Sequence, residues 1–353
     1  MSIINRLNNI QKIQGEYLSE TPPVPKSVKI EVVANCNYNC LFCLHRAKKS
    51  RDLLRDMDWD LFVKIATELK KLGVQEIGPF LIGEPFVNPE LLIKAVTFLK
   101  KDLEIPYVFL TSNASLAAPE HVEALMQAGL DSLKWSVNFA DWDQFYAIAQ
   151  RKAMLFANAE DNIRRAFKVR NSNPLYKTKL YASSIMLDEN QRERMRPFLE
   201  RAILPYVEQH YWLPFYSFNG KISNVSWISK DRDQKKPSRP QSWTIKDGKA
   251  VPDKVAAAAE KTNIYVPTKG CTGHLEEPLS PVPCWTLFTA AHIMSNGIVT
   301  ACGTDATGSW GMGDLKTQSF MEIWHCEKFK QLRLSHLEDR VRGTICEKCI
   351  YGG

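Results

Sequence analysis

The sequence predicts an α/β fold in which strands and helices alternate around a parallel sheet or partial barrel, followed by a smaller carboxyl-terminal unit. Two observations predict this fold class. Between residues 27 and 215, short apolar runs alternate with helical stretches, a rhythm typical of repeated βα units. In the last quarter of the chain this rhythm stops, and six of the nine cysteines gather there among several glycines.

Proline and glycine residues place the individual elements along the chain. Pro89 and Pro119 stand where a first helical turn tolerates proline, and Gly73 and Gly129 stand where helices usually stop. Strands are expected at 28–33, 75–82, 105–111, 131–138, 176–186 and 207–215, and helices at 59–72, 89–101, 119–128, 141–170 and 189–203. Folds of this class carry their chemistry at the carboxyl ends of the strands.

The composition is that of a globular protein. The 353 residues include 46 Lys and Arg against 39 Asp and Glu, a net charge of +7, with 44% hydrophobic and 24% charged residues. No run approaches the roughly 18 apolar residues of a membrane helix, and no secretory signal is recognised. The mild positive charge permits an anionic partner but does not predict nucleic-acid binding. An odd number of cysteines favours a reducing, cytoplasmic setting over a disulfide framework.

The first cysteine group, Cys36-Asn-Tyr-Asn-Cys40-Leu-Phe-Cys43, directly follows the first expected strand. Three thiolates on one loop can bind three irons of a [4Fe–4S] cube, whereas a cluster used only for electron transfer normally has four cysteines. An open metal position indicates chemistry at the metal. The alternatives are buried core thiols and a zinc site, for which His45 is the nearby fourth donor.

The triplet, with Phe42 before its third cysteine, resembles the signature of the radical S-adenosylmethionine (radical SAM) superfamily. The resemblance implies a partial (β/α)6 barrel, a cluster held by Cys36, Cys40 and Cys43, and SAM bound to the open iron. It also implies reductive cleavage of SAM to a 5′-deoxyadenosyl radical, which takes a hydrogen atom from the substrate. A reductant such as flavodoxin or ferredoxin is then an expected partner.

The ends of the second and third strands resemble further motifs of this family. Leu81-Ile82-Gly83-Glu84-Pro85 is similar to Gly-Gly-Glu-Pro, with Ile82 in place of the first glycine. The resemblance assigns Gly83 and Glu84 to the methionine ammonium of SAM, which needs hydrogen-bond acceptors. Thr111-Ser112-Asn113 resembles a second element near the cofactor, so Asn113 is a candidate SAM contact.

The fourth and fifth strands add further candidates for SAM binding. Ser136 and Asn138 fall on one face of the fourth strand, because side chains alternate along a strand. The resemblance implies that this place bonds the ribose or carboxylate of SAM. Arg151, in the following helical stretch, is a candidate partner of that carboxylate, and Ser183 on the fifth strand is another candidate contact.

Two pairs of cysteines near the carboxyl terminus predict a second cluster. Asn296-Gly297, the strongest type of short hairpin signal, lies between Cys284 and Cys302 and should fold them toward one another. Cys346 and Cys349 add two more thiolates, which completes a four-cysteine shell, and a zinc ribbon is the alternative. The arrangement resembles the twitch auxiliary domain of the SPASM/twitch branch of radical SAM enzymes.

The expected organisation has four parts: an amino-terminal extension at 1–26, a radical SAM partial barrel at 27–228, a basic bridging segment at 229–283, and a twitch-type domain at 284–353. The basic segment is interpreted as a linker or surface hairpin, or as a lid that meets an anionic substrate. Cys326 lies on an expected helix at 320–334 and should be inert, whereas Cys271 is a candidate hydrogen-atom donor.

These features predict a radical SAM oxidoreductase with two [4Fe–4S] clusters. The first strand begins at residue 28, so no amino-terminal peptide-recognition domain is expected. This favours a small polar, carbohydrate-like metabolite, dehydrogenated or otherwise remodelled in a biosynthetic pathway. The alternatives are a maturase of a ribosomally made peptide and, among non-enzymes, an iron–sulfur electron carrier.

Overall fold

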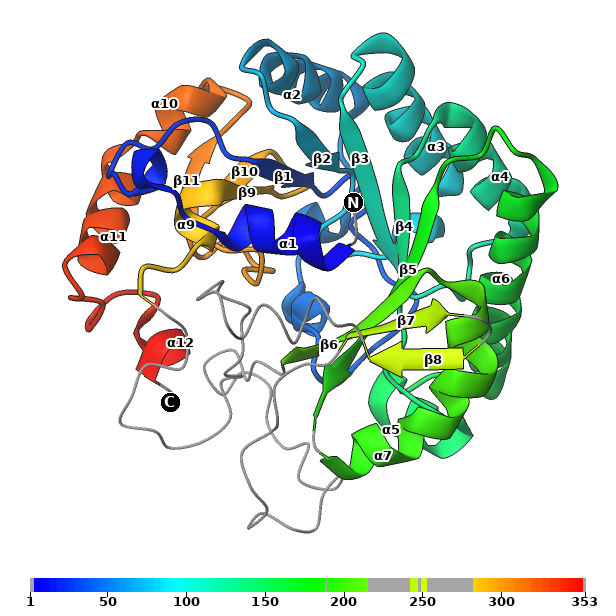
Figure 1. Cartoon of the computed structure of the whole chain (residues 1–353). Coiled ribbons are helices and arrows are strands. Elements are labelled where there is room, and N and C mark those ends of the chain that lie inside the picture. The colour runs from blue at the N-terminus through cyan, green and yellow to red at the C-terminus, as the bar shows by residue number, and fades with distance from the viewer. Residues whose placement is uncertain (1–2, 188, 215–241, 247–248, 253–281, 352–353) are drawn as a thin grey trace.

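A computed structural model describes residues 3–187, 189–214, 242–246, 249–252 and 282–351. Six parallel strands form a curved sheet in chain order, as the sequence predicts, and helices cover its outer face (Figure 1). These strands are β1 (Ser27–Ile30), β2 (Glu76–Gly78), β3 (Tyr107–Ser112), β4 (Ser132–Ser136), β5 (Lys179–Met186) and β6 (Gln209–Pro214). The partial barrel is confirmed, although most strands are shorter than their apolar runs.

The outer helices begin and end largely where local signals predict. The Asp58 carboxylate accepts the Leu61 N–H at 3.1 Å and caps α2, and Gly129 ends α4 with a φ of +96°, a conformation that favours glycine. The helices between strands are α2 (Trp59–Lys71), α3 (Pro89–Thr97), α4 (Pro119–Ala128), α5 (Trp142–Ala149), α6 (Ala153–Ser172) and α7 (Glu189–Phe198).

The helix expected at 141–170 is in fact two helices, α5 and α6. Gln150 adopts a left-handed conformation with a φ of 52° and ends α5. The last carbonyls of α5 accept hydrogen bonds from the cysteine loop, with Asn39 N to Ala149 O at 3.0 Å and Leu41 N to Ile148 O at 2.9 Å. A long-range contact therefore breaks a helix that local sequence would continue.

The carboxyl-terminal unit extends the barrel sheet. Strand β9 (Ala290–Ile293) pairs in parallel with β1, and β10 (Ile298–Thr300) and β11 (Gly311–Asp314) follow in antiparallel order. The predicted hairpin at Asn296-Gly297 is present, with a φ of +88° at Gly297. The remaining helices are α9 (Thr286–Thr289), α10 (Phe320–Trp324), α11 (Glu327–Leu337) and α12 (Glu347–Tyr351). The single helix expected at 320–334 is divided between α10 and α11.

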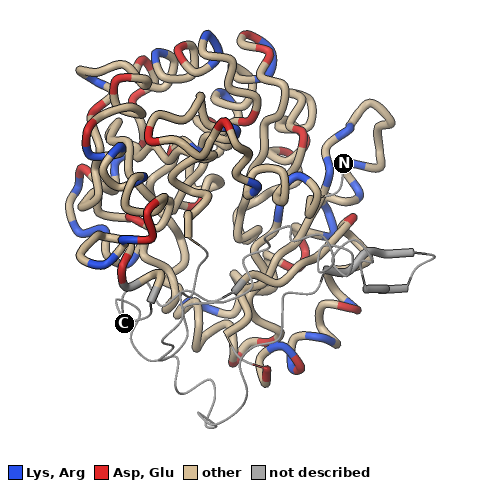
Figure 2. The backbone as a smooth tube through the Cα atoms, turned by 60° about the vertical axis from the view of Figure 1, so that its left-hand side comes forward, with Lys and Arg blue, Asp and Glu red and all other residues tan. Residues whose placement is uncertain are grey.

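At the opposite edge, β7 (Ser242–Lys246) and β8 (Lys249–Pro252) form a hairpin whose first strand pairs antiparallel with β6. This agrees with the hairpin interpretation of part of the basic segment, whose other residues up to 281 lie outside the described ranges. Acidic and basic residues are interspersed over the described part of the chain (Figure 2). Among the described helices, none combines the length and apolar character that crossing a bilayer requires.

Helix α1 (Ile3–Gln11) packs against the amino ends of the strands. Arg6 forms an ion pair at 2.8 Å with Glu76, the first residue of β2, and its guanidinium lies over the Phe109 ring at 3.9 Å. Ile3 and Ile4 pack against tyrosines of β5 and β6. The helix therefore closes one end of the barrel and leaves the carboxyl ends of the strands as the site of chemistry.

Candidate active site

The three cysteines of the first motif lie together on the loop after β1, at the carboxyl end of the barrel. Cys36, Cys40 and Cys43 pack into one apolar cluster, whose buried members are Tyr38, Phe42, Phe139, Phe145, Ile148 and Ala149. The aromatic rings contact one another edge to face, as in the Tyr38–Phe145 pair at 5.3 Å. The three thiols are therefore partly enclosed by apolar side chains.

The electrostatics of the thiols fit a metal cluster. Burial, with the charges of Glu84 and Cys43, raises the pKa of Cys36 to about 12. Burial and the charges of Cys43 and Cys36 raise the pKa of Cys40 as well. Three thiolates at this place therefore need the positive charge of bound metal, which lowers the pKa of a ligating thiol.

One feature weighs against a mononuclear zinc ion at the first cysteine group. The His45 Nε2 lies 3.1 Å from the Ala34 carbonyl oxygen, so this ring nitrogen is engaged by the backbone. A [4Fe–4S] cluster does not need this histidine, because each of the three thiolates binds a different iron.

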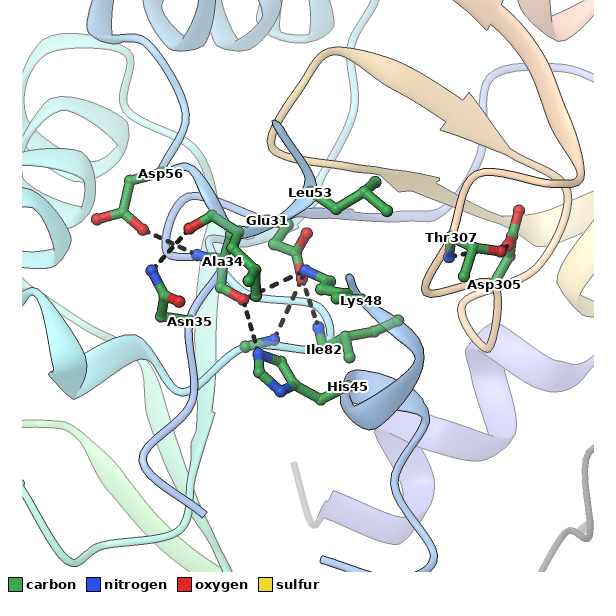
Figure 3. Close-up of polar contacts among 12 residues, drawn as sticks. Glu31, Ala34, Asn35, His45, Lys48, Leu53, Asp56, Ile82, Asp305 and Thr307 are labelled. Atoms are coloured by element: carbon green, nitrogen blue, oxygen red, sulfur yellow. Dashed lines mark hydrogen bonds and ion pairs between the residues drawn. The ribbon is translucent and has the colours of Figure 1, made fainter. Parts of the chain in front are cut away.

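A buried ion pair that the sequence did not reveal anchors the cysteine loop (Figure 3). Lys48 Nζ lies 2.7 Å from Glu31 Oε1, and both side chains are almost completely buried. The same carboxylate oxygen accepts the Ile82 and Gly83 N–H groups at 3.2 Å, and Lys48 also donates to the Ala34 carbonyl at 3.3 Å. The pair therefore ties the cysteine loop to the end of the second strand unit.

We expect Lys48→Met to lower the free energy of unfolding by about 3–5 kcal/mol, because it leaves the buried Glu31 carboxylate unpaired. The double substitution Glu31→Gln with Lys48→Met should recover part of this loss. The exposed neighbour Lys49 supplies the control Lys49→Met, which should change stability by no more than about 0.5 kcal/mol. Anaerobic denaturant unfolding of the cluster-loaded proteins measures these differences. Equal stability of Lys48→Met and Lys49→Met would contradict the claim that the buried Glu31–Lys48 ion pair stabilises the cysteine loop.

The Gly83-Glu84-Pro85 segment docks directly on the cysteine loop. The Glu84 N–H donates to the Asn35 carbonyl at 2.7 Å. Its carboxylate accepts the Phe86 N–H at 3.1 Å, the Ser112 hydroxyl at 2.8 Å and the Asn113 N–H at 2.7 Å. Burial raises the pKa of Glu84 to about 7, against the opposing effect of these hydrogen bonds. Glu84 therefore holds the ends of the second and third strand units together.

Gly83 is required by close packing. A Cβ at this position would lie 2.2 Å from the Val33 carbonyl oxygen, a backbone atom that has little freedom to move. Overpacking of this kind costs about 1–3 kcal/mol. We expect Gly83→Ala to weaken SAM binding at least about tenfold, as measured by equilibrium dialysis. The control Gly15→Ala, where nothing lies within 4 Å of the added Cβ, should bind SAM normally. Normal SAM binding by Gly83→Ala would show that the cysteine loop can shift to make room for the added Cβ without loss of SAM affinity.

Asn113 and Arg151 meet at Asn37, in the middle of the cysteine motif. The Asn113 amide donates to Asn37 Oδ1 at 2.9 Å, and Arg151 Nε donates to the Asn37 carbonyl at 2.8 Å. Ser115 completes the network by accepting from the Asn37 amide at 2.8 Å. Arg151 lies in the link between α5 and α6, and not within a helix as expected. Both residues therefore brace the cysteine loop, and their contact with SAM stays a prediction.

Ser136 and Ser183 are register partners on β4 and β5, and both line a cavity of about 260 Å³ inside the barrel. Asn138 contacts Ser136 and links β4 to β5. Its side-chain amide donates to Ser136 Oγ at 3.2 Å, and its Oδ1 accepts the Ile185 N–H at 2.8 Å. The structure thus brings the two serines together at the cavity and assigns Asn138 a bracing contact.

The four carboxyl-terminal cysteines also gather at one place. Burial and the charges of Cys302 and Cys349 raise the pKa of Cys284 to about 12. Burial, followed by the charges of Cys284, Cys302 and Cys349, raises the pKa of Cys346. Each thiol therefore lies within electrostatic range of the others, as a four-cysteine cluster requires.

Two cysteines, Cys271 and Cys326, are not assigned to either cysteine group. Cys326 precedes α11, and its Sγ lies 3.6 Å from the Met312 carbonyl oxygen, which agrees with a structural role. Cys271 lies outside the described residues, so its proposed role as a hydrogen-atom donor stays a prediction.

The two cysteine-bearing units face each other across a small hollow. Leu44 and Ala47, just after the first motif, line it on one side, and residues of the loop after Cys302, among them Asp305 and Trp310, line it on the other. Figure 3 shows Asp305 and Thr307 on this facing loop. The loop after Cys302 therefore lies beside the segment that follows the first cysteine motif.

Comparisons with known proteins agree with this architecture. The model of the radical SAM superfamily matches residues 30–195, and that of the SPASM iron–sulfur cluster-binding domain matches residues 284–350. An S-adenosylmethionine-dependent nucleotide dehydratase, RSAD2 of Oncorhynchus mykiss, is 31% identical over 194 residues, which are 52% of this chain and 51% of the relative. A GTP 3′,8-cyclase of Chlorobaculum tepidum is 30% identical over 124 residues, 35% of this chain and 36% of the relative.

Among solved structures, Streptococcus suis SuiB bound to the precursor peptide SuiA matches with a TM-score of 0.58 at 13% identity. The match covers 92% of this chain and 68% of SuiB, and it shows a common fold. The chain spans about half the length, or less, of the curated relatives it matches. The two domain matches indicate [4Fe–4S] clusters and SAM as cofactors. The chain belongs to the radical SAM superfamily, in the branch that carries an auxiliary SPASM/twitch iron–sulfur domain.

Proposed function

We propose that this radical SAM enzyme abstracts a hydrogen atom from a carbon of a small polar, carbohydrate-like metabolite and oxidises it. The observation that carries the proposal is the cavity inside the barrel, whose largely apolar lining includes several hydroxyl groups. Thr111, Ser136, Ser183 and Tyr211 line it with hydroxyl groups, which match the hydroxyls of a sugar. A cavity of about 260 Å³ lies just below the range of about 300–1,000 Å³ that is typical of small-molecule pockets, which favours a small substrate.

Separate groups of residues have separate roles in this proposal. Cys36, Cys40 and Cys43 are proposed to hold the catalytic cluster, and four cysteines, Cys284, Cys302, Cys346 and Cys349, the auxiliary one. When bound, the reduced cluster and SAM supply a 5′-deoxyadenosyl radical, and the auxiliary cluster supplies an electron acceptor for an oxidative outcome. Helix α1 closes the amino end of the cavity, which keeps bulk water from a reactive substrate. A flavodoxin or ferredoxin is the proposed reductant.

The related enzymes support a small polar substrate that contains a sugar. The names of the dehydratase and of the cyclase both specify a nucleotide as substrate, and a nucleotide carries a ribose or deoxyribose. Neither name describes a net oxidation, so dehydration and cyclisation are the competing outcomes. The auxiliary-domain match at residues 284–350 favours oxidation, because removing a second electron from a substrate radical requires an acceptor.

A peptide maturase is the second candidate function, and the structural likeness to SuiB with its precursor peptide favours it. The two candidate functions differ in the molecule that gives up the hydrogen atom, which is a small metabolite in the first and a peptide in the second. Deuterium-labelled cell extract can therefore be separated into a small-molecule fraction and a peptide fraction, and each fraction incubated with the reduced protein and unlabelled SAM. Mass spectrometry of the 5′-deoxyadenosine then reports which fraction transfers deuterium.

We expect transfer from the small-molecule fraction alone. Transfer from the peptide fraction alone would favour the maturase, and formation of no 5′-deoxyadenosine would favour an electron carrier. Once the substrate is identified, the parent protein and Cys271→Ala are compared in deuterated buffer. An oxidised product that is unaffected by the substitution supports dehydrogenation. Loss of product in Cys271→Ala, with solvent deuterium at an inverted carbon in the parent product, would indicate epimerisation.

A further inference from the structure

The barrel cavity contains an unusual excess of positive charge. Lys29 on β1, Lys134 on β4 and Arg6 on α1 all line it. Within the described residues, no Asp or Glu lines the cavity beside them. The side-chain alternation of the strands directs both lysines inward, since Val28, Ile30, Leu133 and Trp135 are buried in the core on the other face.

The three cations differ in how their charge is compensated. Arg6 is paired with Glu76 at 2.8 Å. Lys134 Nζ donates to the neutral Tyr211 hydroxyl at 3.1 Å. Lys29 Nζ lies 5.5 Å from the centre of the Phe80 ring, and within the described part of the chain its ammonium has no ion pair or hydrogen bond. Within the described residues neither lysine therefore forms an ion pair with a carboxylate, although the Cys302 thiol lies within electrostatic range of Lys29, in a site where charge is costly to bury.

The lysines also repel each other. Burial, with the charges of Lys134 and Arg6 and against the opposing effect of Cys302, lowers the pKa of Lys29 to about 8. Burial and the charge of Arg6 lower the pKa of Lys134 to about 8. His292 also lines the cavity, but burial and the charge of Lys29 lower its pKa to about 3, so it adds no charge. An anion placed between the lysines would relieve this repulsion.

We propose that Lys29 and Lys134 bind an anionic group of the substrate, a phosphate or a carboxylate, deep in the barrel, so that its sugar-like part extends toward Ser136 and Ser183. This inference rests on the proposed function and specifies the substrate class. Lysine suits this role, because its ammonium group forms charge-assisted hydrogen bonds with a phosphate or with a carboxylate. The lid interpretation of the basic segment, an alternative that the sequence leaves open, concerns residues that lie mostly outside the described ranges.

Binding of simple anions by the cluster-loaded protein tests the proposal. Isothermal titration calorimetry is run with pyrophosphate and with malonate as separate probes, on the parent, Lys29→Met and Lys134→Met. The exposed Lys168 of α6 provides the charge-matched control Lys168→Met. We expect each cavity substitution to weaken the preferred anion at least about tenfold and the control to bind like the parent. Stronger binding of pyrophosphate identifies a phosphate ester as the substrate group, and stronger binding of malonate identifies a carboxylate.

A second measurement requires no substitution at either lysine. Acetic anhydride reacts with unprotonated amines, and in peptide mapping the bound anion should slow the acetylation of Lys29 and Lys134 of the parent relative to the anion-free protein. The proposal is overturned if the parent binds neither anion, if the cavity variants bind as the control does, or if the anion leaves both lysines reactive. Reductive SAM cleavage is assayed in parallel. A protein that cleaves SAM without binding anions contradicts this inference alone, and one that binds anions without cleaving SAM contradicts the proposed function alone.

Discussion

The triple substitution of Cys36, Cys40 and Cys43 by alanine is expected to abolish SAM cleavage and to leave about four of the parent's roughly eight irons per chain. The three thiols share one apolar pocket, and no described side chain nearby can replace them, because His45 is engaged by the Ala34 carbonyl. The remaining irons should belong to the auxiliary cluster. Anaerobic reconstitution, iron and sulfide analysis, and chromatography of 5′-deoxyadenosine measure both effects.

Cys326→Ala is the matched control for this experiment, since it removes one thiol that lies outside both cysteine groups. It should retain all the iron and full SAM cleavage. Cleavage that persists in the triple variant would contradict the assignment of the catalytic cluster. Iron loss in Cys326→Ala would show that the control residue is itself a ligand.

Replacing Cys346 and Cys349 by alanine is expected to remove one cluster and stop product formation, while reductive cleavage of SAM continues. The barrel loop that carries the first motif is braced independently, by the Glu31–Lys48 pair and by the contacts of Asn37. The carboxyl-terminal unit should lose stability, because a metal-held unit draws folding free energy from its ligands. Iron analysis, the yield of 5′-deoxyadenosine and thermal unfolding separate these effects.

Two results would contradict this second prediction. Stoichiometric zinc in the parent at this site would replace the cluster by a structural metal. Normal substrate turnover by the double variant would show that the auxiliary site is not needed for the reaction. Cys326→Ala again serves as the control, because it leaves all four candidate auxiliary ligands in place.

Local sequence patterns predicted the order and type of the barrel elements. Apolar runs and helix-ending glycines such as Gly129 act over a few residues, so they mark strands and helix ends without knowledge of the fold. The division of 141–170 into two helices was not predictable in this way. It depends on hydrogen bonds between α5 and the cysteine loop, which is more than 100 residues distant in the sequence.

Motif spacing located the cysteines, but the residues that position them were missed. Glu31 follows an apolar strand and Lys48 lies in a basic stretch, so neither stands out until the fold brings them to 2.7 Å. A single acid within an apolar run was the one available signal. Lys29 and Lys134 were not recognised as cavity residues for a related reason. Strand alternation predicts that their side chains point inward, but only the folded structure shows that, among the described residues, no Asp or Glu lines the cavity beside them.

The parallel pairing of β9 with β1 also lay beyond the sequence analysis. The two strands are separated by more than 250 residues, and no periodicity reports which edge of a sheet a later strand will join. The hairpin that contains β9 was predictable, because Asn296-Gly297 specifies its turn locally. The pairing of β9 with β1 matters for function, because it brings the loop after Cys302 close to the first cysteine motif.

Reductive cleavage of SAM by the reconstituted parent protein tests the central claim most directly. The protein is reduced with dithionite under anaerobic conditions, supplied with SAM, and analysed for 5′-deoxyadenosine and methionine. The account predicts both products in equal amounts from the parent and neither from the Cys36/Cys40/Cys43 triple variant. A parent protein that carries its full iron content but forms no 5′-deoxyadenosine would contradict it.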